Sequence, residues 1–277
     1  MSVGKILLPL SGRNDADATA ETAFILAERF GAQVEGLHPA TPPIDRFAIQ
    51  DEAGAAMQYQ RLLEQAKIQA KRDEDNARSR FATWSKAHKK VKTGFLALEG
   101  DAGDSVAHRA RLADLTVIPK VTKKEGGFRM VVREAALFQS GRPVVIAPEK
   151  KVAAHTGETI VIAWKESVEA ARAVAAALPL CGKAKAVHIV SAGSGKEAVR
   201  SLAEIKKYMA LHFPKVTAKM VRGGKNVGAA LLAEASKQKG PLLVMGGYSQ
   251  WRWKEWVFGG VTEYVLNETG IPVLMAH

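Results

Sequence analysis

The 277-residue chain repeats one pattern of apolar segments, once in each half, and this duplication restricts its fold more than any other feature. Each half begins with a short apolar run and ends with a Gly-x-Pro turn and another run, and a third run precedes that turn. These segments occupy 6–10, 115–118 and 141–146 in the first half and 160–164, 242–245 and 270–275 in the second. The runs are continuous rather than alternating in polarity, as expected of strands buried on both faces of a parallel sheet.

Helical patterns fall between these strands. Residues 15–30 place apolar side chains on one face and end before Gly31, while residues 167–178 form an alanine-rich counterpart that we expect to end at Pro179. Each half therefore alternates strands and helices and has five strands. This alternation predicts an α/β protein with two tandem doubly wound five-stranded parallel sheets, each with helices on both faces.

The length favours two domains. The polar segment 148–158 is typical of a linker, so we place a first domain at 1–149 and a second at 157–277. The two halves differ after their second strand. There the first half carries a long helical insertion, about 52–90, with one apolar stripe, whereas the second half has a shorter helix at 196–211.

Composition narrows the possible environments and partners. The net charge is +12, and residues 151–277 hold 17 Lys and Arg against nine acidic residues, all of them Glu. The positive electrostatic field of such a chain favours anionic partners such as nucleotides. A basic surface in contact with solvent is, however, the simpler explanation of the charge. The single cysteine, Cys181, excludes an internal disulfide and suits a reducing compartment. No apolar run approaches the roughly 18 residues that span a bilayer. We therefore expect a cytoplasmic protein without a membrane partner.

A glycine-rich turn follows the fourth strand of the second half. It begins with Gly246-Gly247 and closes with Gly259-Gly260, just before a short helical segment over 261–267 that carries Thr262 in its first turn. In open parallel sheets, ligands bind at the carboxyl ends of strands where the strand order reverses. Bare backbone at the start of a helix presents N–H groups and a positive helix end to a phosphate. The sequence therefore predicts an anion site here.

Over essentially its whole length the chain resembles the universal stress protein family in its tandem two-domain form. The resemblance is carried by the duplicated pattern, by Gly246-x-x-Ser249, by Gly259-Gly260-Val261-Thr262 and by the final Pro272-Val273-Leu274. ATP-binding members of that family carry Gly-x2-Gly-x9-Gly followed by Ser or Thr. The chain keeps this spacing but has Ser249 at the second glycine and Gly260 at the hydroxyl position. The resemblance implies flavodoxin-like winding, as in the adenine nucleotide α hydrolases, for each sheet.

The resemblance further implies a non-enzymatic stress-response regulator that binds ATP or a related adenine nucleotide in its second domain. The residues implied for the phosphates are Gly246, Gly247, Ser249, Gly259, Gly260, Val261 and Thr262, with Ala163, Trp164 and Lys165 near the base or ribose. Lys165 stands where the family usually has Asp, and a lysine cannot accept a hydrogen bond from ribose or adenine. The family also implies that the final strands, 143–147 and 272–276, pair the two domains, while a further homodimer stays open.

The first half lacks the matching glycines. Counting back from Gly141 aligns Gly259-Gly260 with Met130-Val131, whose side chains would keep a phosphate from the backbone, so we interpret the first site as degenerate. The Ser11-Gly12-Arg13 loop only partly matches the ATP pyrophosphatases, which adenylate their substrates. His38 and His188 lie at or near the ends of the second strands, so either could sit near a ligand crevice. The seven histidines show no zinc spacing, and no Gly-x-Ser-x-Gly motif presents a serine nucleophile.

Two alternatives to a nucleotide-binding protein stay open. The first is a nucleotide-free interaction or scaffold module that uses the basic surface and the loop holding Trp251, Trp253 and Trp256, since tryptophans of this kind more often pack at interfaces than stack on bases. The second, less favoured, is an adenylate-forming or ATP-hydrolysing enzyme. We expect no metal and no nucleic-acid partner.

Overall fold

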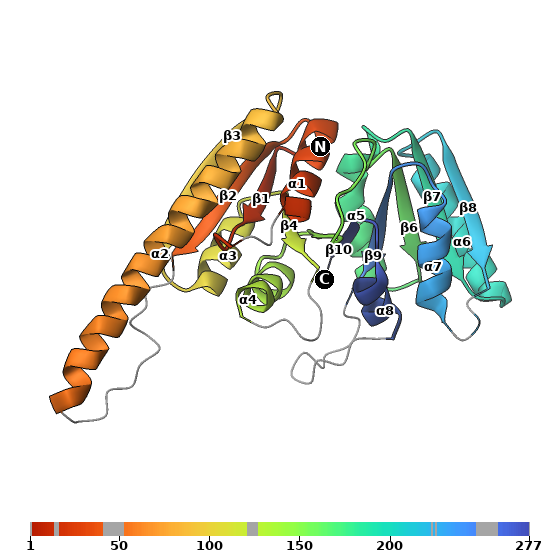
Figure 1. Ribbon diagram of the computed structural model, residues 1–277. Coiled ribbons are helices and arrows are strands. Elements are labelled where there is room, and N and C mark those ends of the chain that lie inside the picture. Colours follow the sequence, from red (N-terminus) through yellow and green to blue (C-terminus); the bar gives the residue numbers. More distant parts are fainter. Residues whose placement is uncertain are drawn as a thin grey trace.

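The computed structural model describes residues 2–13, 17–40, 53–120, 127–222, 224, 226–247 and 260–276, with the side chains of the long second helix described from Gln60 onward. Each half alternates strands with helices, as predicted (Figure 1). The first half contains β1 (Lys5–Pro9), α1 (Asp17–Phe30), β2 (Gln33–Ala40), α2 (Ala53–Ala87), β3 (Thr93–Glu99), α3 (Ala102–Ala110), β4 (Leu115–Pro119), α4 (Phe128–Glu134), a π-helical turn over Ala135–Gln139 and β5 (Val144–Ala147). The second half contains β6 (Thr159–Trp164), α5 (Val168–Cys181), β7 (Ala186–Ala192), α6 (Lys196–Ala210), β8 (Val216–Val221), α7 (Val227–Ser236), β9 (Pro241–Gly246), α8 (Gly260–Glu268) and β10 (Val273–Ala276).

The ten strands of the described residues form one sheet, in the order β3-β2-β1-β4-β5-β10-β9-β6-β7-β8. Within each half the strands are parallel, and the chain winds outward from β1 or β6 in one direction and then returns to build the other side. The two halves therefore repeat one doubly wound α/β topology, which confirms the predicted fold class. They meet at β5 and β10, which run antiparallel with Leu274 opposite Val145.

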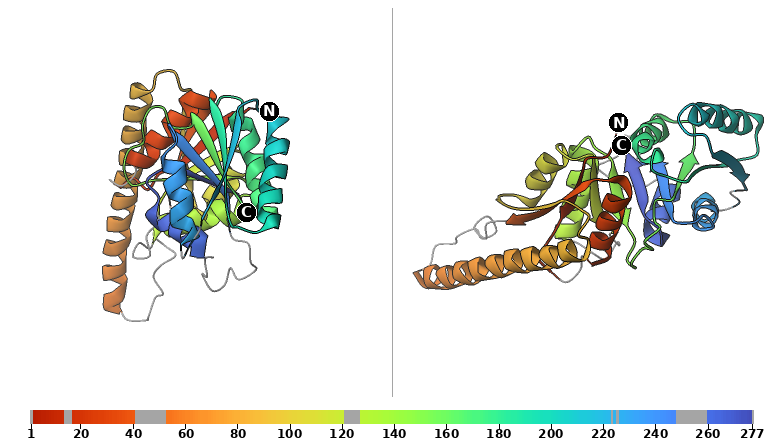
Figure 2. Two further views of the ribbon diagram at one scale, coloured as in Figure 1. Left: turned by 90° about the vertical axis from the view of Figure 1, so that its right-hand side faces the viewer. Right: turned by 90° about the horizontal axis from the view of Figure 1, so that it is seen from above.

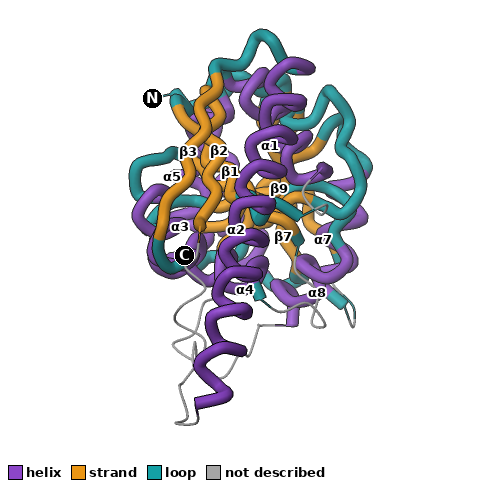
Figure 3. Tube along the Cα trace, turned by 60° about the vertical axis from the view of Figure 1, so that its left-hand side comes forward, coloured by secondary structure: helices purple, strands orange, loops and turns teal. Residues whose placement is uncertain are grey.

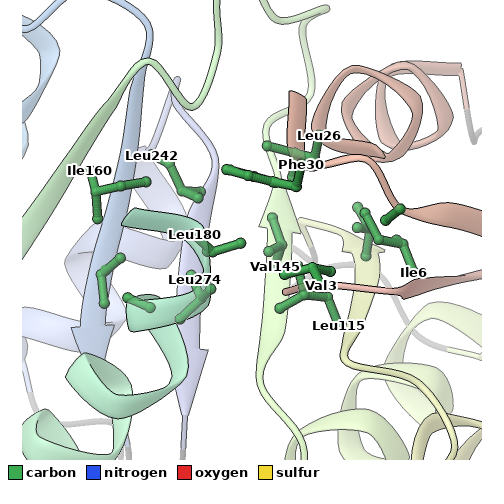
Figure 4. Close-up of a cluster of buried hydrophobic side chains, with 14 of the residues drawn as sticks. Val3, Ile6, Leu26, Phe30, Leu115, Val145, Ile160, Leu180, Leu242 and Leu274 are labelled. Atoms are coloured by element: carbon green, nitrogen blue, oxygen red, sulfur yellow. The ribbon is translucent and has the colours of Figure 1, made fainter. Parts of the chain in front are cut away.

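Two apolar cores cover the two faces of this sheet. Helices α1, α2, α5 and α6 bury the first core, and α3, α4, α7 and α8 bury the second. Each core contains residues from both halves. In Figure 4 buried side chains of the first core, among them Val145, Leu180 and Leu274, face one another across the junction of β5 and β10. The cores are thus continuous between the halves, and burial of this apolar area is the main force that holds them together.

Helix α5 extends beyond the end that the sequence predicted. We expected it to stop at Pro179, but it continues to Cys181 with the proline inside. A proline at this place in a helix removes one backbone hydrogen bond and crowds the carbonyl four residues earlier, which is a cost to stability. Here it is offset because Leu180 and Cys181, at 0% and 1% exposure, bury their side chains in the first core.

The long helix α2 distinguishes the first half. Its carboxyl-terminal part lies along β2 and β3 (Figure 3), where Phe81 packs against Gly36 so closely that a β-carbon there would meet the ring at 2.7 Å. Its amino-terminal part extends well past the sheet (Figures 1 and 2), and Leu62 and Ile68 on it are 40% and 48% exposed. Among the described helices none combines the length and the apolarity that crossing a membrane requires.

Candidate functional site

The strand order of the second half reverses between β6 and β9. The chain leaves β6 toward β7 and β8 and returns through β9 to β10, so β6 and β9 are neighbours although three helices separate them in sequence. Ala163 lies opposite Met245, and Trp164 and Gly246 end these two strands. Carboxyl ends at such a reversal point are the usual ligand-binding location in doubly wound sheets. The structure thus brings four predicted site residues together, namely Ala163, Trp164, Lys165 and Gly246.

Gly246 is used for packing within the protein. The first turn of α5 crosses the end of β9, and a β-carbon on Gly246 would lie 2.5 Å from the Ala170 nitrogen. Beside it, a β-carbon on Gly247 would lie 2.2 Å from Cε of Met275, while the Gly247 N–H donates to the Ala276 carbonyl at 3.3 Å. The bare backbone that the sequence suggested for a phosphate is therefore occupied here by α5 and by Met275.

Gly260 differs from Gly246 and Gly247 in its surroundings. It is the first residue of α8, it is exposed, and among the described residues no atom lies within 4 Å of the place where its β-carbon would be. Thr262 follows in the first helical turn and is partly exposed, whereas Val261 packs against the second core. The first turn of a helix has N–H groups without intrahelical partners and a positive end, and both attract an anion. Ser249, Gly259 and the Trp251–Trp256 loop lie outside the described residues.

Trp164 and Lys165, at the end of β6, differ in their contacts and exposure. The indole Nε1–H of Trp164 donates to Oγ of Ser201 at 2.9 Å, which directs this ring toward α6 and the first core rather than toward α8. Lys165 is exposed at the strand end and makes no ion pair with any residue that the structure describes. It can therefore meet a negatively charged group. Nothing in the local sequence identifies Ser201 as the hydrogen-bond partner of Trp164, because Trp164 ends β6 and Ser201 lies in α6.

The equivalent location in the first half is covered by α2. A β-carbon on Gly12, which follows β1 and has a φ of +79°, would lie 2.0 Å from the carbonyl oxygen of Asp73. Arg80 of α2 donates from Nη1 to the Arg13 carbonyl at 2.8 Å and pairs with Asp17. These contacts hold helix α2 against the loop between β1 and α1.

A small hollow remains beside this loop, and mostly apolar side chains line it. The lining residues are Pro9, Ser11, Thr19, Pro119, Phe128, Arg129 and Val132. Helix α4 begins at Phe128, so Met130 and Val131 lie within its first turn rather than at its start. The alignment of Met130-Val131 with Gly259-Gly260, which allowed no gap before Gly141, therefore places the start of α4 about one helical turn too late.

Neither of the histidines noted in the sequence lies on a strand at a reversal point: His38 is on β2 and His188 is on β7. His38 is buried, and its Nδ1–H donates to the Leu10 carbonyl at 2.9 Å. His188 is the third residue of β7 and lies under α7 beside Glu234. Within the described part of the chain, no three His, Cys, Asp or Glu residues are grouped in a way that could hold a metal ion.

Comparisons with known proteins agree with this architecture. Residues 157–277 match the model of the universal stress protein family. A universal stress protein from Archaeoglobus fulgidus DSM 4304 has a TM-score of 0.68 at 15% identity, over 98% of this chain and 97% of that one. A functionally unknown protein from Pseudomonas aeruginosa PAO1 has a TM-score of 0.59 at 13% identity, over 99% and 92%.

A similar fold occurs in a domain of a cotransporter. The cytoplasmic domain of a prokaryotic cation chloride cotransporter has a TM-score of 0.52 at 10% identity, over 99% of this chain and 96% of that one. At such low identities these structures show a common fold for both halves and nothing about ligands. No match was found among curated proteins. The second half of the chain, residues 157–277, thus matches the universal stress protein family, and the fold of both halves is similar to that of a solved universal stress protein.

Proposed function

We propose that this protein is a non-enzymatic, cytoplasmic stress-response regulator that binds ATP or another adenine nucleotide at the reversal point of its second half. The observation that carries the proposal is the exposed backbone of Gly260 at the start of α8, since no atom of the described residues lies within 4 Å of its β-carbon position. The family match over 157–277 supports the same conclusion.

The proposed phosphate site is built from the turn that opens α8. Gly260 and Val261 supply N–H groups, Thr262 supplies a hydroxyl, and Ser249 and Gly259 complete the turn in the sequence motif. Lys165 at the end of β6 contributes a positive charge that can pair with phosphate. Ala163 and the backbone of Trp164 lie where the base or ribose would sit. Gly246 and Gly247 then act indirectly, because they let α5 and β10 pack close to the turn.

One nucleotide per chain is expected. In the first half α2 covers the loop after β1 through the contacts of Gly12 and Arg80, so we propose that only the second half binds. The first half, about 1–149, would then serve as a structural partner of the second, about 157–277, through β5 and β10.

Calorimetric titration of ATP at low salt tests this proposal. Gly260→Asp should abolish binding, because its carboxylate would repel phosphate at the helix start. Gly270→Asp is the matched control: Gly270 lies just beyond the other end of α8, is exposed, and also has no atom within 4 Å of its β-carbon position. Equal ATP affinity for Gly260→Asp and the wild type would refute this site.

A nucleotide-free interaction module is the second candidate. It is favoured by the filling of the space beside Gly246 and Gly247 by α5 and Met275, which leaves less room for a ligand. Mass spectrometry of small molecules released from freshly purified protein separates the two candidates. Absence of a nucleotide, together with no calorimetric ATP signal, would favour the interaction module.

A further inference from the structure

The turns that lead into β7, β8 and β9 carry positive charge and no negative charge. They span residues 182–185, 211–215 and 237–240, and each lies at the amino end of its strand. Their charged side chains at pH 7 are all exposed lysines, namely Lys183, Lys185, Lys215, Lys237 and Lys239. Amino ends of parallel strands meet at one edge of a sheet, which is the upper edge of the second half in Figure 1. We call the surface formed by these five lysines the basic face.

Backbone hydrogen bonds place these turns side by side. In the sheet β9, β6, β7 and β8 are neighbours in that order. The Lys185 N–H donates to the Glu158 carbonyl at 2.7 Å, and the Val187 N–H donates to the Lys215 carbonyl at 3.2 Å. Neighbouring strands are about 4.8 Å apart, so the row of four strand ends is about 14 Å wide. The lysines therefore belong to one continuous surface.

The carboxylates that pair with these lysines do not neutralise the basic face. Glu158 and Glu234 are only 7% and 6% exposed. Each is shared by at least two cations within 3.7 Å, which are Arg29, Lys185 and Lys239 around Glu158 and Lys219 and Lys237 around Glu234. Lys183 and Lys215 make no ion pair with any residue that the structure describes. The exposed surface therefore keeps an excess of positive charge.

The helix dipole explains only part of this pattern. A cation just past the carboxyl end of a helix is stabilised by the dipole, but the effect fades within one turn. Lys183 and Lys237 lie just beyond the ends of α5 and α7, whereas Lys215 lies well beyond the end of α6 and directly before β8. Repulsion among gathered like charges destabilises the folded chain, and an anionic partner would relieve it.

An apolar patch adjoins the basic face. Leu211 lies in the same turn as Lys215 and is 80% exposed. Tyr208, in the last turn of α6, is 42% exposed, and its ring meets the ring of His212 edge-on with the centroids 5.0 Å apart. Covering these side chains removes apolar surface from water. A partner that covers the lysines and this patch together needs both acidic and apolar groups.

We propose that the basic face binds an acidic protein segment that also carries apolar side chains. Its carboxylates lie against Lys183 and Lys215, and an apolar side chain lies against Leu211. Complementary charge steers such a segment to the face and fixes its orientation. The face lies at the opposite edge of the sheet from the proposed nucleotide site and does not rest on it.

The chemistry of the face favours a protein segment over other polyanions. The three turns contain no arginine, the residue that binds phosphate groups in a bidentate way, which disfavours a nucleic acid. The apolar patch consists of Leu211 and Tyr208, which is much less than the broad apolar face with which interfacial helices enter a lipid surface.

Fluorescence anisotropy with the full-length protein tests the proposal. The probe is a fluorescein-labelled peptide of aspartate and glutamate with interspersed leucines. Lys183→Glu combined with Lys215→Glu should weaken binding at least about tenfold, because attraction becomes repulsion at two contacts. Neither lysine has an ion pair to lose among the described residues, so the fold should be kept.

The matched control is Lys196→Glu combined with Arg222→Glu. These two exposed residues lie at the opposite edge of the same half, and the control changes the net charge by the same amount. The strands between the edges have six or seven residues, so the edges are about 20 Å apart, beyond the Debye length of about 8 Å at physiological salt. The control should therefore keep the wild-type affinity.

Leu211→Ala tests the apolar part of the interface. It should weaken binding by about two- to fivefold. This loss should persist at high salt, because salt screens the lysine contacts and not the apolar one.

Amide NMR of the wild-type protein gives a readout that needs no variant. The peptide should shift resonances of residues 182–185, 211–215 and 237–240. Shifts confined to the carboxyl ends of the strands, equal weakening by the two charge-reversed pairs, or no binding of the peptide would each overturn the proposal. Tighter binding of a single-stranded RNA or of phosphatidylserine vesicles than of the peptide would also overturn it. Gly260→Asp should bind the peptide as the wild type does, so failure of the nucleotide site leaves the basic face unaffected.

Discussion

Gly12 and Asp73 are in backbone contact: a β-carbon on Gly12 would lie 2.0 Å from the carbonyl oxygen of Asp73. The contact joins the loop after β1 to the middle of α2 and fixes where the long helix crosses the first half. Gly12 also has a φ of +79°, a conformation that side chains disfavour.

Gly12→Ala should therefore destabilise the protein for two reasons. The left-handed backbone alone costs about 1–2 kcal/mol with a side chain, and displacing α2 should add about 1–3 kcal/mol. Gly31→Ala is the matched control, because Gly31 has a φ of +76° but no atom within 4 Å of its β-carbon position. Denaturant unfolding of both variants measures the difference. Equal losses would show that Asp73 does not press on Gly12.

Glu35 should make the stability of the first half depend on pH. Burial disfavours its charge, but hydrogen bonds from Arg109 and Lys5 outweigh burial and lower the pKa of Glu35. Arg109 is the closer partner, with Nη2 at 2.6 and 2.7 Å from the two carboxylate oxygens. A lowered pKa in the folded state means that the stabilisation is present above pH 4.5 and is lost as the pH falls through the folded value.

Glu35→Gln tests this contribution. At pH 7 we expect a loss of about 1–3 kcal/mol in the free energy of unfolding, because the Arg109 guanidinium is left without its carboxylate. Below pH 4.5 the wild type should lose stability more steeply than the variant. Urea unfolding at several pH values measures both slopes, and parallel slopes would mean that Glu35 titrates normally.

Much of this fold could be predicted because its signals are local. The continuous apolar runs at 6–10, 115–118, 160–164 and 242–245 specify strands buried on both faces, and the polar, amphipathic segments between them specify helices. The error at the end of α5 has a tertiary cause. Burial of Leu180 and Cys181 outweighs the helix-ending tendency of Pro179, and only the folded core shows how deeply these two residues are buried.

The candidate site was less predictable because each glycine is defined by what lies against it. Gly246 and Gly260 look alike in the sequence, yet the first turn of α5 fills the space beside Gly246, while no atom of the described residues lies beside Gly260. The hydrogen bond between Trp164 and Ser201 likewise depends on tertiary contact. A motif specifies where bare backbone occurs, and only packing decides whether protein or ligand covers it.

Cys181 should behave as a reporter of unfolding. Its side chain is 1% exposed in the first core, and burial raises the pKa of the thiol to about 11. Because the thiolate is the reactive form, little of it exists at pH 8. We expect a disulfide reagent to label Cys181 at the rate at which the protein opens, and to label denatured protein at once. Rapid labelling of the native protein would place Cys181 outside the core.

Leu274 tests whether the two halves unfold as one unit. It is fully buried in the core that continues across β5 and β10, opposite Val145. Leu274→Ala should cost about 2–5 kcal/mol in the free energy of unfolding. Because both halves share this core, hydrogen exchange of β1 and of β6 should increase together. The control Val199→Ala, at a residue that is 55% exposed on α6, should change stability by less than about 0.5 kcal/mol. Faster exchange in β6 alone would mean that each half is stable without the other.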